Sequence, residues 1–167
     1  ATSETDLIVR RLDGAAGRSS LLGSFAAGFP GQVRRVRNAA WSPDGTTLAF
    51  DWDRQAGTSA VQDIWLVAFD PVTGAFRGAP RQVTADGEIP LGGGLYVDAV
   101  SPAWTPDGRR IAYGLLTYSN AAQGITQLQV RVVPATASKA KGETILDRAV
   151  AIPNSYSDLF TIDVSRF

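Results

Sequence analysis

The stretch Ala39–Phe50, "AAWSPDGTTLAF", decides the fold expected for this chain. Apolar residues alternate with small or polar ones on both sides of a Ser-Pro-Asp-Gly tetrapeptide, and a period of two predicts strands. Proline presets the backbone for the first central turn position, aspartate can bond nearby backbone N–H groups, and glycine supplies a positive φ. The stretch therefore predicts a β-hairpin with a short loop.

The phrase recurs sixty-three positions later as Pro102–Tyr113, "PAWTPDGRRIAY". The tryptophan, the turn and the following apolar pair are all matched, and chance does not align three such features together. Repetition on this scale indicates a solenoid, a propeller or an array, and strands without intervening helical periodicity favour the propeller. Both tryptophans are expected to pack between sheets. The residues expected to form this structural repeat motif are Trp41, Pro43, Asp44, Gly45, Trp104, Pro106, Asp107 and Gly108.

Further segments extend each hairpin to a unit of four strands. Residues 61–74 predict a third strand with two apolar faces and then a turn, with a short outer strand from Arg81. The fold expected is all-β: a β-propeller segment of four-stranded antiparallel blades. It is expected to be incomplete, because a closed propeller needs at least four blades. The expected parts are blades at 34–85 and 98–148 and partial blades at 6–25 and 155–167.

Composition narrows the possible functions of this 167-residue chain. Its net charge is zero, which disfavours a nucleic-acid binder, and its one basic run, Arg34–Arg37, would divide between two faces of a strand. No apolar run reaches the roughly 20 residues that span a bilayer. Cysteine and histidine are absent, which excludes disulfides, a Ser-His-Asp triad and the usual zinc ligands. No enzymatic activity and no cofactor are therefore expected.

Three local features have both a functional and a structural interpretation. Asp51 and Asp53 would share one face of a strand and could reach one calcium ion, but a solvated strand end or a backbone cap is favoured. Gly92–Gly94 lacks the Lys-Ser/Thr of a phosphate-binding loop and is interpreted as a loop tip. Asp44 and Asp107 recur in both units, which favours a role in the turns because an active site is normally built once.

A rim of long loops is the surface expected to bind partners, because loops carry function on rigid scaffolds. The loops proposed are Arg54–Val61 and Ala85–Val100. Aromatic residues and arginine are enriched at the centres of protein interfaces. The alternative is that such residues only cover the ends of the blades. The candidate partner-binding residues, expected to be exposed on this rim, are Trp52, Arg54, Tyr96 and Tyr118.

The repeated unit resembles that of TolB-like β-propellers: Trp-Ser-Pro-Asp-Gly, two variable residues, Leu/Ile-Ala-Phe/Tyr, and an Asp-Ile-Trp third strand. The resemblance covers residues 39–70 and 102–133 closely and residues 6–25 and 158–167 loosely. The spacing of the copies exceeds the usual repeat of about 40–45 residues. The resemblance implies a non-catalytic protein-interaction or assembly module, located in the bacterial periplasm or at the outer surface and docking to envelope proteins.

Two other functions stay open at this point. Prolyl-oligopeptidase-like serine hydrolases carry a related propeller, so the catalytic domain of such an enzyme would lie outside these residues. A Gly-x-Ser-x-Gly elbow beyond Phe167 would establish that function. A carbohydrate or small-ligand binder using a central channel is the other alternative, although the innermost positions Ala39, Ala40 and Ala103 are small and favour close packing.

Overall fold

The computed structural model describes residues 7–10, 18–20, 35–56, 59–86 and 94–153, in which ten strands and no helix are found. Two short strands, β1 (Ile8–Arg10) and β2 (Arg18–Ser20), pair with each other in antiparallel fashion. The other eight form two four-stranded sheets. Sheet 1 contains β3 (Arg35–Trp41), β4 (Thr47–Ala56), β5 (Ser59–Asp70) and β6 (Ala75–Gln82), and sheet 2 contains β7 (Leu95–Trp104), β8 (Arg110–Ser119), β9 (Gly124–Pro134) and β10 (Glu143–Pro153).

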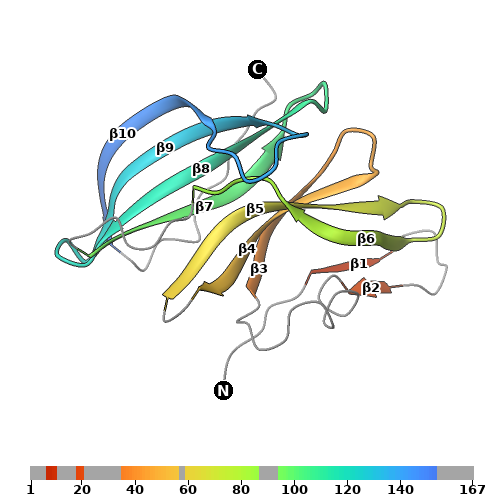
Figure 1. Cartoon of the computed structure of the whole chain (residues 1–167), viewed down its shortest axis with the longest axis horizontal. Coiled ribbons are helices and arrows are strands. Elements are labelled where there is room, and N and C mark those ends of the chain that lie inside the picture. The colour runs from red at the N-terminus through yellow and green to blue at the C-terminus, as the bar shows by residue number, and fades with distance from the viewer. Residues whose placement is uncertain (1–6, 11–17, 21–34, 57–58, 87–93, 154–167) are drawn as a thin grey trace.

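The fold is all-β, with two antiparallel sheets arranged side by side as neighbouring blades of a propeller-like stack (Figure 1). Strand order follows chain order in each sheet, and β7 contacts β3, β4 and β5 of the neighbouring sheet. The described residues form no closed ring of blades. β1 and β2 lie within the predicted partial blade 6–25, whereas the predicted partial blade 155–167 lies outside the described residues.

Both copies of the repeated phrase form the same turn, held by the same hydrogen bonds. The Gly45 amide donates to the Ser42 carbonyl and the Gly108 amide to the Thr105 carbonyl, each at 2.9 Å. Gly45 and Gly108 have φ of +69° and +68°, the left-handed conformation that glycine adopts without strain. This match follows from the sequence, because the turn residues satisfy one another locally.

Each sheet has two faces that differ in side-chain size, because successive side chains along a strand point to opposite sides. The cross-strand register places the motif tryptophan and the apolar residues after the turn on one face, which we call the Trp face. The opposite face, which carries the intervening alanine, is called the Ala face. The defining residues are Trp41, Leu48 and Phe50 for the Trp face of sheet 1, Trp104, Ile111 and Tyr113 for that of sheet 2, and Ala49 and Ala112 for the two Ala faces.

The main core forms where the Ala face of sheet 1 meets the Trp face of sheet 2. Small residues on the first face let the larger side chains of the second approach closely, and burial of this apolar surface stabilises the stack. Trp104 packs against the edge of the core. The buried core residues are Ala49, Ile64, Leu66, Val83, Val97, Ala99, Ile111, Tyr113, Leu115 and Val133.

Each sheet also has a face directed away from the other. The Trp face of sheet 1 is aromatic, and the Trp52 and Trp65 rings pack edge to face with centroids 5.1 Å apart. Leu7 packs against this cluster, so β1 and β2 lie on the side of sheet 1 away from sheet 2 (Figure 1). A smaller cluster on sheet 2 contains Val100, Leu116 and Ile125.

Two expected loops and one expected strand are wrong in position. The segment Arg54–Val61 is not a rim loop, because β4 and β5 stay paired as far as Ala56 and Ser59. The outer strand of sheet 1 begins at Ala75 instead of Arg81, directly after the turn. In the other predicted loop, the residues from Leu95 belong to β7, while residues 87–93 lie outside the described part of the chain. Pairing continues wherever both strands can satisfy their backbone groups, which local turn signals do not reveal.

Replacing Gly108 with valine is expected to destabilise the protein by about 2 kcal/mol, because a β-branched residue is strained at positive φ. A Cβ there would lie 3.6 Å from Pro43 Cδ, an ordinary contact, so the loss comes from the backbone. Urea denaturation measures the effect, with Gly108→Asn as the control because asparagine tolerates this conformation. Equal midpoints for Gly108→Val and the parent would contradict the assigned turn.

Candidate functional site

Trp52 does not lie on an exposed rim as expected. It belongs to β4, is 3% exposed, and packs in the aromatic cluster on the Trp face of sheet 1. The reason is that the alternation after the turn continues past Phe50, so Trp52 points to the same face two residues later. That continued alternation was the sequence signal for its burial.

Tyr96 and Tyr118 lie on paired strands and not on loops. They face each other across β7 and β8, and both are half-buried. The Asn120 side chain donates to the Tyr96 hydroxyl at 3.2 Å, and Tyr118 packs against the Val100 cluster. Arg54 is paired with Val61 near the end of β4, and its side chain lies outside the described atoms. The structure therefore brings the two tyrosines together and places Trp52 on the other sheet.

The two motif tryptophans have different environments. Trp104 donates its indole N–H to the Ala40 carbonyl at 3.0 Å and packs against the core between the sheets, as expected. Trp41 was expected in the same setting, but it is 41% exposed and makes an edge-to-face contact with Phe69. The expectation is wrong for Trp41 because its face is the Trp face of sheet 1, which no four-stranded sheet of the described residues covers.

The motif aspartates have the structural role that their repetition suggested. Asp44 accepts from the Ser42 hydroxyl at 2.5 Å and from the Thr46 amide at 3.0 Å. In the second copy, Asp107 accepts from the Thr105 hydroxyl at 2.6 Å and from an amide at 3.0 Å. These hydrogen bonds, the hydroxyl bond first, hold the pKa of both carboxyls below the usual range. Both groups are thus bonded within their own turns.

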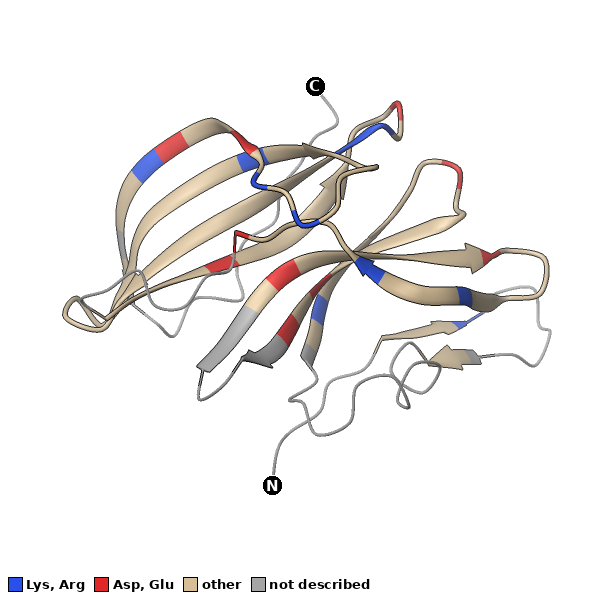
Figure 2. Ribbon diagram, viewed as in Figure 1, with Lys and Arg blue, Asp and Glu red and all other residues tan. Residues whose placement is uncertain are grey.

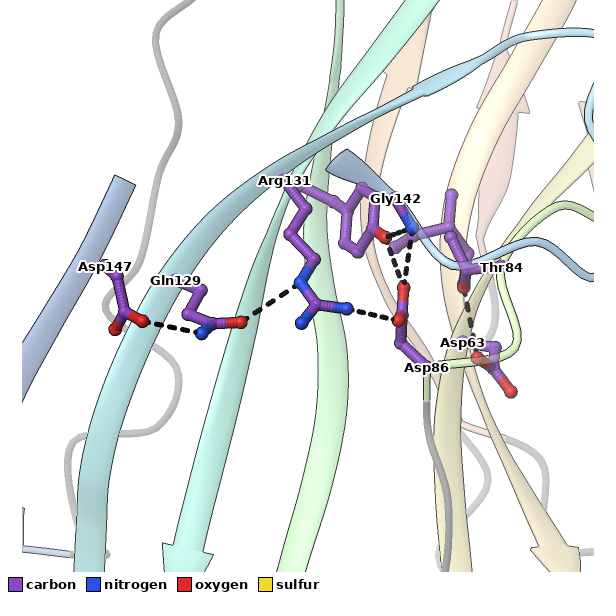
Figure 3. A network of polar contacts seen from close by, with 9 residues as sticks. Asp63, Thr84, Asp86, Gln129, Arg131, Gly142 and Asp147 are labelled. Carbon is purple, nitrogen blue, oxygen red and sulfur yellow. Dashed lines mark hydrogen bonds and ion pairs between the residues drawn. The ribbon is translucent and has the colours of Figure 1, made fainter. Parts of the chain in front are cut away.

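A buried polar network joins the two sheets at their outer edge (Figure 3). The Asp86 carboxylate, which follows β6, accepts from Arg131 Nη1 at 2.6 Å and from the Tyr113 hydroxyl. The Gly142 amide donates to the Tyr113 hydroxyl at 2.9 Å. Burial, and then the bond to Asp86, raises the pKa of Tyr113 above its ordinary value, so the phenol stays protonated.

Backbone hydrogen bonds and Arg81 also hold the two sheets together at this edge. The Ala140 amide donates to the Val83 carbonyl at 2.9 Å, and the Ala85 amide donates to the Ala140 carbonyl at 3.0 Å. Arg81 Nη2 donates to the Ala135 carbonyl at 2.6 Å, and Nη1 donates to a second carbonyl in the same loop. The loop between β9 and β10 is thereby fixed to the edge of sheet 1.

Asp51, in β4, connects β3 and β7, the first strands of the two sheets. Its carboxylate accepts from the Asn38 side chain at 2.7 Å, from the Asn38 amide at 3.1 Å, and from the Ser101 amide of β7 at 3.0 Å. Ser101 has φ of 54° at a β-bulge, a strained position for a residue with a side chain, and the bond to Asp51 supports it. This geometry matches the backbone-cap interpretation of Asp51.

A group of acidic residues lies at the junction of β4, β5 and β7. Burial, and then the negative charge of Asp53, raises the pKa of Asp98 to about 7, with Asp63 adding to the effect. The Gln62 backbone amide and the charge of Arg37 oppose this shift. Asp98 therefore changes charge near neutral pH, unlike the aspartates of the two turns.

We expect Asp98→Asn to stabilise the protein by about 2 kcal/mol at pH 8 and not at all at pH 3.5. The folded-state pKa of Asp98 is raised from 3.8 to about 7. Its favourable contribution is fully present below pH 4, and it is lost as the pH rises through 7. Thermal denaturation across pH 3.5–8 measures the difference. Asp147→Asn, at an exposed carboxyl whose pKa is lowered, serves as the control and should show no such gain.

The surface has two hollows, one between sheet 1 and sheet 2 and one on sheet 2. The first, of about 590 Å³, lies between the sheets next to the turns and is lined by Ser42, Pro43 and Trp104 among others. The described residues that line the second, of about 530 Å³, belong to sheet 2 and its turn and include Thr105, Pro106 and Ile145. Both hollows lie against Ala faces, and among the described lining residues a tryptophan is found in the first.

Charge and metal chemistry do not single out another site in the described part of the chain. Basic and acidic residues are interspersed, and neither sign gathers on one sheet (Figure 2). No group of three or more His, Cys, Asp or Glu residues that could hold a metal ion is found among the residues described. Within the same residues, no helix is long and apolar enough to cross a membrane.

Comparison of the chain with protein-family models, curated proteins and solved structures found no match. Function is therefore inferred from the geometry of the two sheets and from the repeated motif. The residues that join the sheets, Asp86, Arg131 and Gly142, were not singled out from the sequence, because they are widely separated and carry no local motif.

Proposed function

We propose that this chain is a non-catalytic, TolB-like β-propeller module that assembles with other proteins in the bacterial cell envelope. The observation that supports assembly most directly is the stacking of two four-stranded sheets through matched faces, in a described part of the chain that forms no closed ring of blades. Exposed large apolar residues occur at both ends of this stack, namely Trp41 on sheet 1 and Ile145 and Leu146 on sheet 2. Exposed apolar surface of this kind favours protein contacts.

The chemistry of the chain supports a binding role over catalysis. Histidine and cysteine are absent from the sequence, and the recurring aspartates are bonded within their turns. The location in the envelope and the TolB-like class are taken from the resemblance of the repeated motif. The composition, the turn-bound aspartates and the repeated motif all fit a rigid β-scaffold that binds other proteins.

The test is to isolate the natural polypeptide from its source cells under native conditions and to measure the mass of the particle and of its components. We expect a particle heavier than the polypeptide alone, with stable companions, in the envelope fraction. A polypeptide that runs alone, or that fractionates with the cytosol, would contradict the proposal. Hydrolysis of peptide substrates by the isolated polypeptide would favour the hydrolase alternative instead.

A further inference from the structure

We propose that the first half of β7, Leu95–Val100, is a pH-operated latch between the two sheets. The latch is closed against β4 and β5 in mildly acid solution and is released progressively as the pH rises to neutrality, while the second half of β7 stays docked. The inference is carried by two aspartates at the junction, Asp98 and Asp51, whose carboxyl groups accept from the opposite sheet in different surroundings. It does not depend on the proposed assembly function.

The second half of β7 is fixed to sheet 1 by two hydrogen bonds. The Ser101 amide donates to the Asp51 carboxylate at 3.0 Å, and the Trp104 indole donates to the Ala40 carbonyl at 3.0 Å. The side chain and the backbone amide of Asn38, in β3, donate to the same Asp51 carboxylate, which holds it in place. Neither contact brings a second carboxylate close, so this half of β7 is expected to stay docked.

The first half of β7 is joined to sheet 1 through Asp98. The Asp98 carboxyl accepts from the backbone amide of Gln62, in β5. Val97 and Ala99, on either side of Asp98, are buried in the main core between the sheets, so apolar packing brings this part of the strand against sheet 1. Gln62 is paired with Asp53 across β4 and β5, and both side chains are buried. The donor of this contact therefore lies beside another carboxylate.

The charged groups around Asp98 come from all three strands of sheet 1 that β7 contacts. Arg37, in β3, favours the ionised form of Asp98, but its side chain is exposed and its charge is screened by water. Asp53, in β4, and Asp63, in β5, are buried, and their negative charges oppose ionisation. Within sheet 2, the residue opposite Asp98 is the apolar Leu116 of β8. A second negative charge at this junction is therefore costly.

The direction of the switch follows from this imbalance. Burial, and then the charge of Asp53, raises the pKa of Asp98 to about 7 in the closed form. In the released form the carboxyl is in water and ionises from about pH 4. Protonation of Asp98 thus favours the closed form below pH 4, and this contribution is lost as the pH rises through 7.

The outer edge of the junction limits the release to the first half of β7. Asp86 is paired there with Arg131, so a rise in pH through neutrality sets no like charges against each other. Backbone hydrogen bonds also join the Ala140 position to Val83 and Ala85. The two sheets therefore stay attached while the Leu95–Val100 segment is released.

Release changes one end of the hairpin formed by β7 and β8. Tyr96 and Tyr118 face each other at this end and are, among the described residues, the other titratable side chains of its two strands near Asp98. Leaving the closed position frees this end from β5, because the bond between Asp98 and Gln62 is broken. The latch thus couples pH to the surface that the two tyrosines form.

The test is amide hydrogen exchange of the full chain, labelled with ¹⁵N, at pH 5 and pH 8, with each rate corrected for the intrinsic rate at that pH. Two amides report on the two halves of β7, since Gln62 donates to Asp98 and Ser101 donates to Asp51. We expect the protection of the Gln62 amide to fall by roughly tenfold or more from pH 5 to pH 8. The protection of the Ser101 amide should stay unchanged.

Three variants assign the effect to the junction. Asp98→Asn keeps a side-chain acceptor for Gln62 without the charge, so the protection of Gln62 should be the same at both pH values. Asp53→Asn removes a negative charge beside Asp98 and should move the midpoint of the transition to lower pH. The matched control is Asp147→Asn, at an exposed carboxyl of sheet 2, which should keep the pH dependence of the parent.

Three results would overturn the proposal. Equal protection of Gln62 at pH 5 and pH 8 in the parent would mean that Asp98 changes charge without release. A fall retained in full by Asp98→Asn would assign the pH dependence to another group. An equal fall at Gln62 and Ser101 would mean that the whole junction loosens and that β7 contains no latch.

Discussion

Replacing Asp86 with alanine is expected to lower the free energy of unfolding by about 3–5 kcal/mol, the usual loss when one partner of a buried ion pair is removed. The Asp86 side chain is 1% exposed and that of Arg131 is 19% exposed. The variant leaves the guanidinium with less compensation and deprives the Tyr113 hydroxyl of its acceptor. Urea denaturation followed by far-ultraviolet circular dichroism measures the change.

Two further variants show how much of this loss comes from the Tyr113 hydrogen bond and how much from the unpaired charge of Arg131. Tyr113→Phe removes only the hydroxyl group and should cost about 1 kcal/mol. Asp86→Ala combined with Arg131→Met should recover part of the stability, because no charge is then left unpaired at the junction. A double variant no more stable than Asp86→Ala would mean that packing, and not the ion pair, accounts for the loss.

Replacing Trp104 with alanine is expected to cost about 3 kcal/mol, because a large side chain is removed from the contact between the sheets. The indole also gives up its bond to the Ala40 carbonyl. The same change at Trp41 should cost less than about 1 kcal/mol, since that ring is 41% exposed and its aromatic contact is with Phe69.

The comparison of the two tryptophans is informative because they hold the same place in the repeat. Thermal and urea denaturation of the two single variants give the difference directly. Equal losses would mean that Trp41 is as well packed as Trp104, and that the Trp face of sheet 1 is covered in solution. A larger loss at Trp104 would confirm that the two copies of the motif tryptophan are packed differently.

The hairpins could be predicted from the sequence because their determinants are local. Each Pro-Asp-Gly turn is satisfied by its own Ser or Thr, Asp and Gly, within six residues. The alternation of side chains then assigns residues to faces, and the repetition of the phrase predicts two similar sheets. Four-stranded antiparallel sheets in an all-β, propeller-like arrangement follow from these signals.

The ends of strands and the exposure of particular residues could not be predicted in the same way. Pairing of β4 with β5 continues past the expected loop, which buries Trp52 where an exposed rim residue was expected. The candidate partner-binding residues follow from residue type, and type alone does not determine which face of a strand is covered. Exposure depends on neighbours that are distant in sequence.

The sequence by itself determined the turns, the alternating faces and the repetition, because these depend on backbone preferences and on residues a few positions apart. Only the tertiary structure decided which face of one sheet meets which face of the other. It joined Asp86 to Arg131 across 45 positions, and it covered Trp104 but left Trp41 exposed. The physical reason is that burial and ion pairing are properties of the packed sheets, so closely similar motifs acquire different roles from their neighbours.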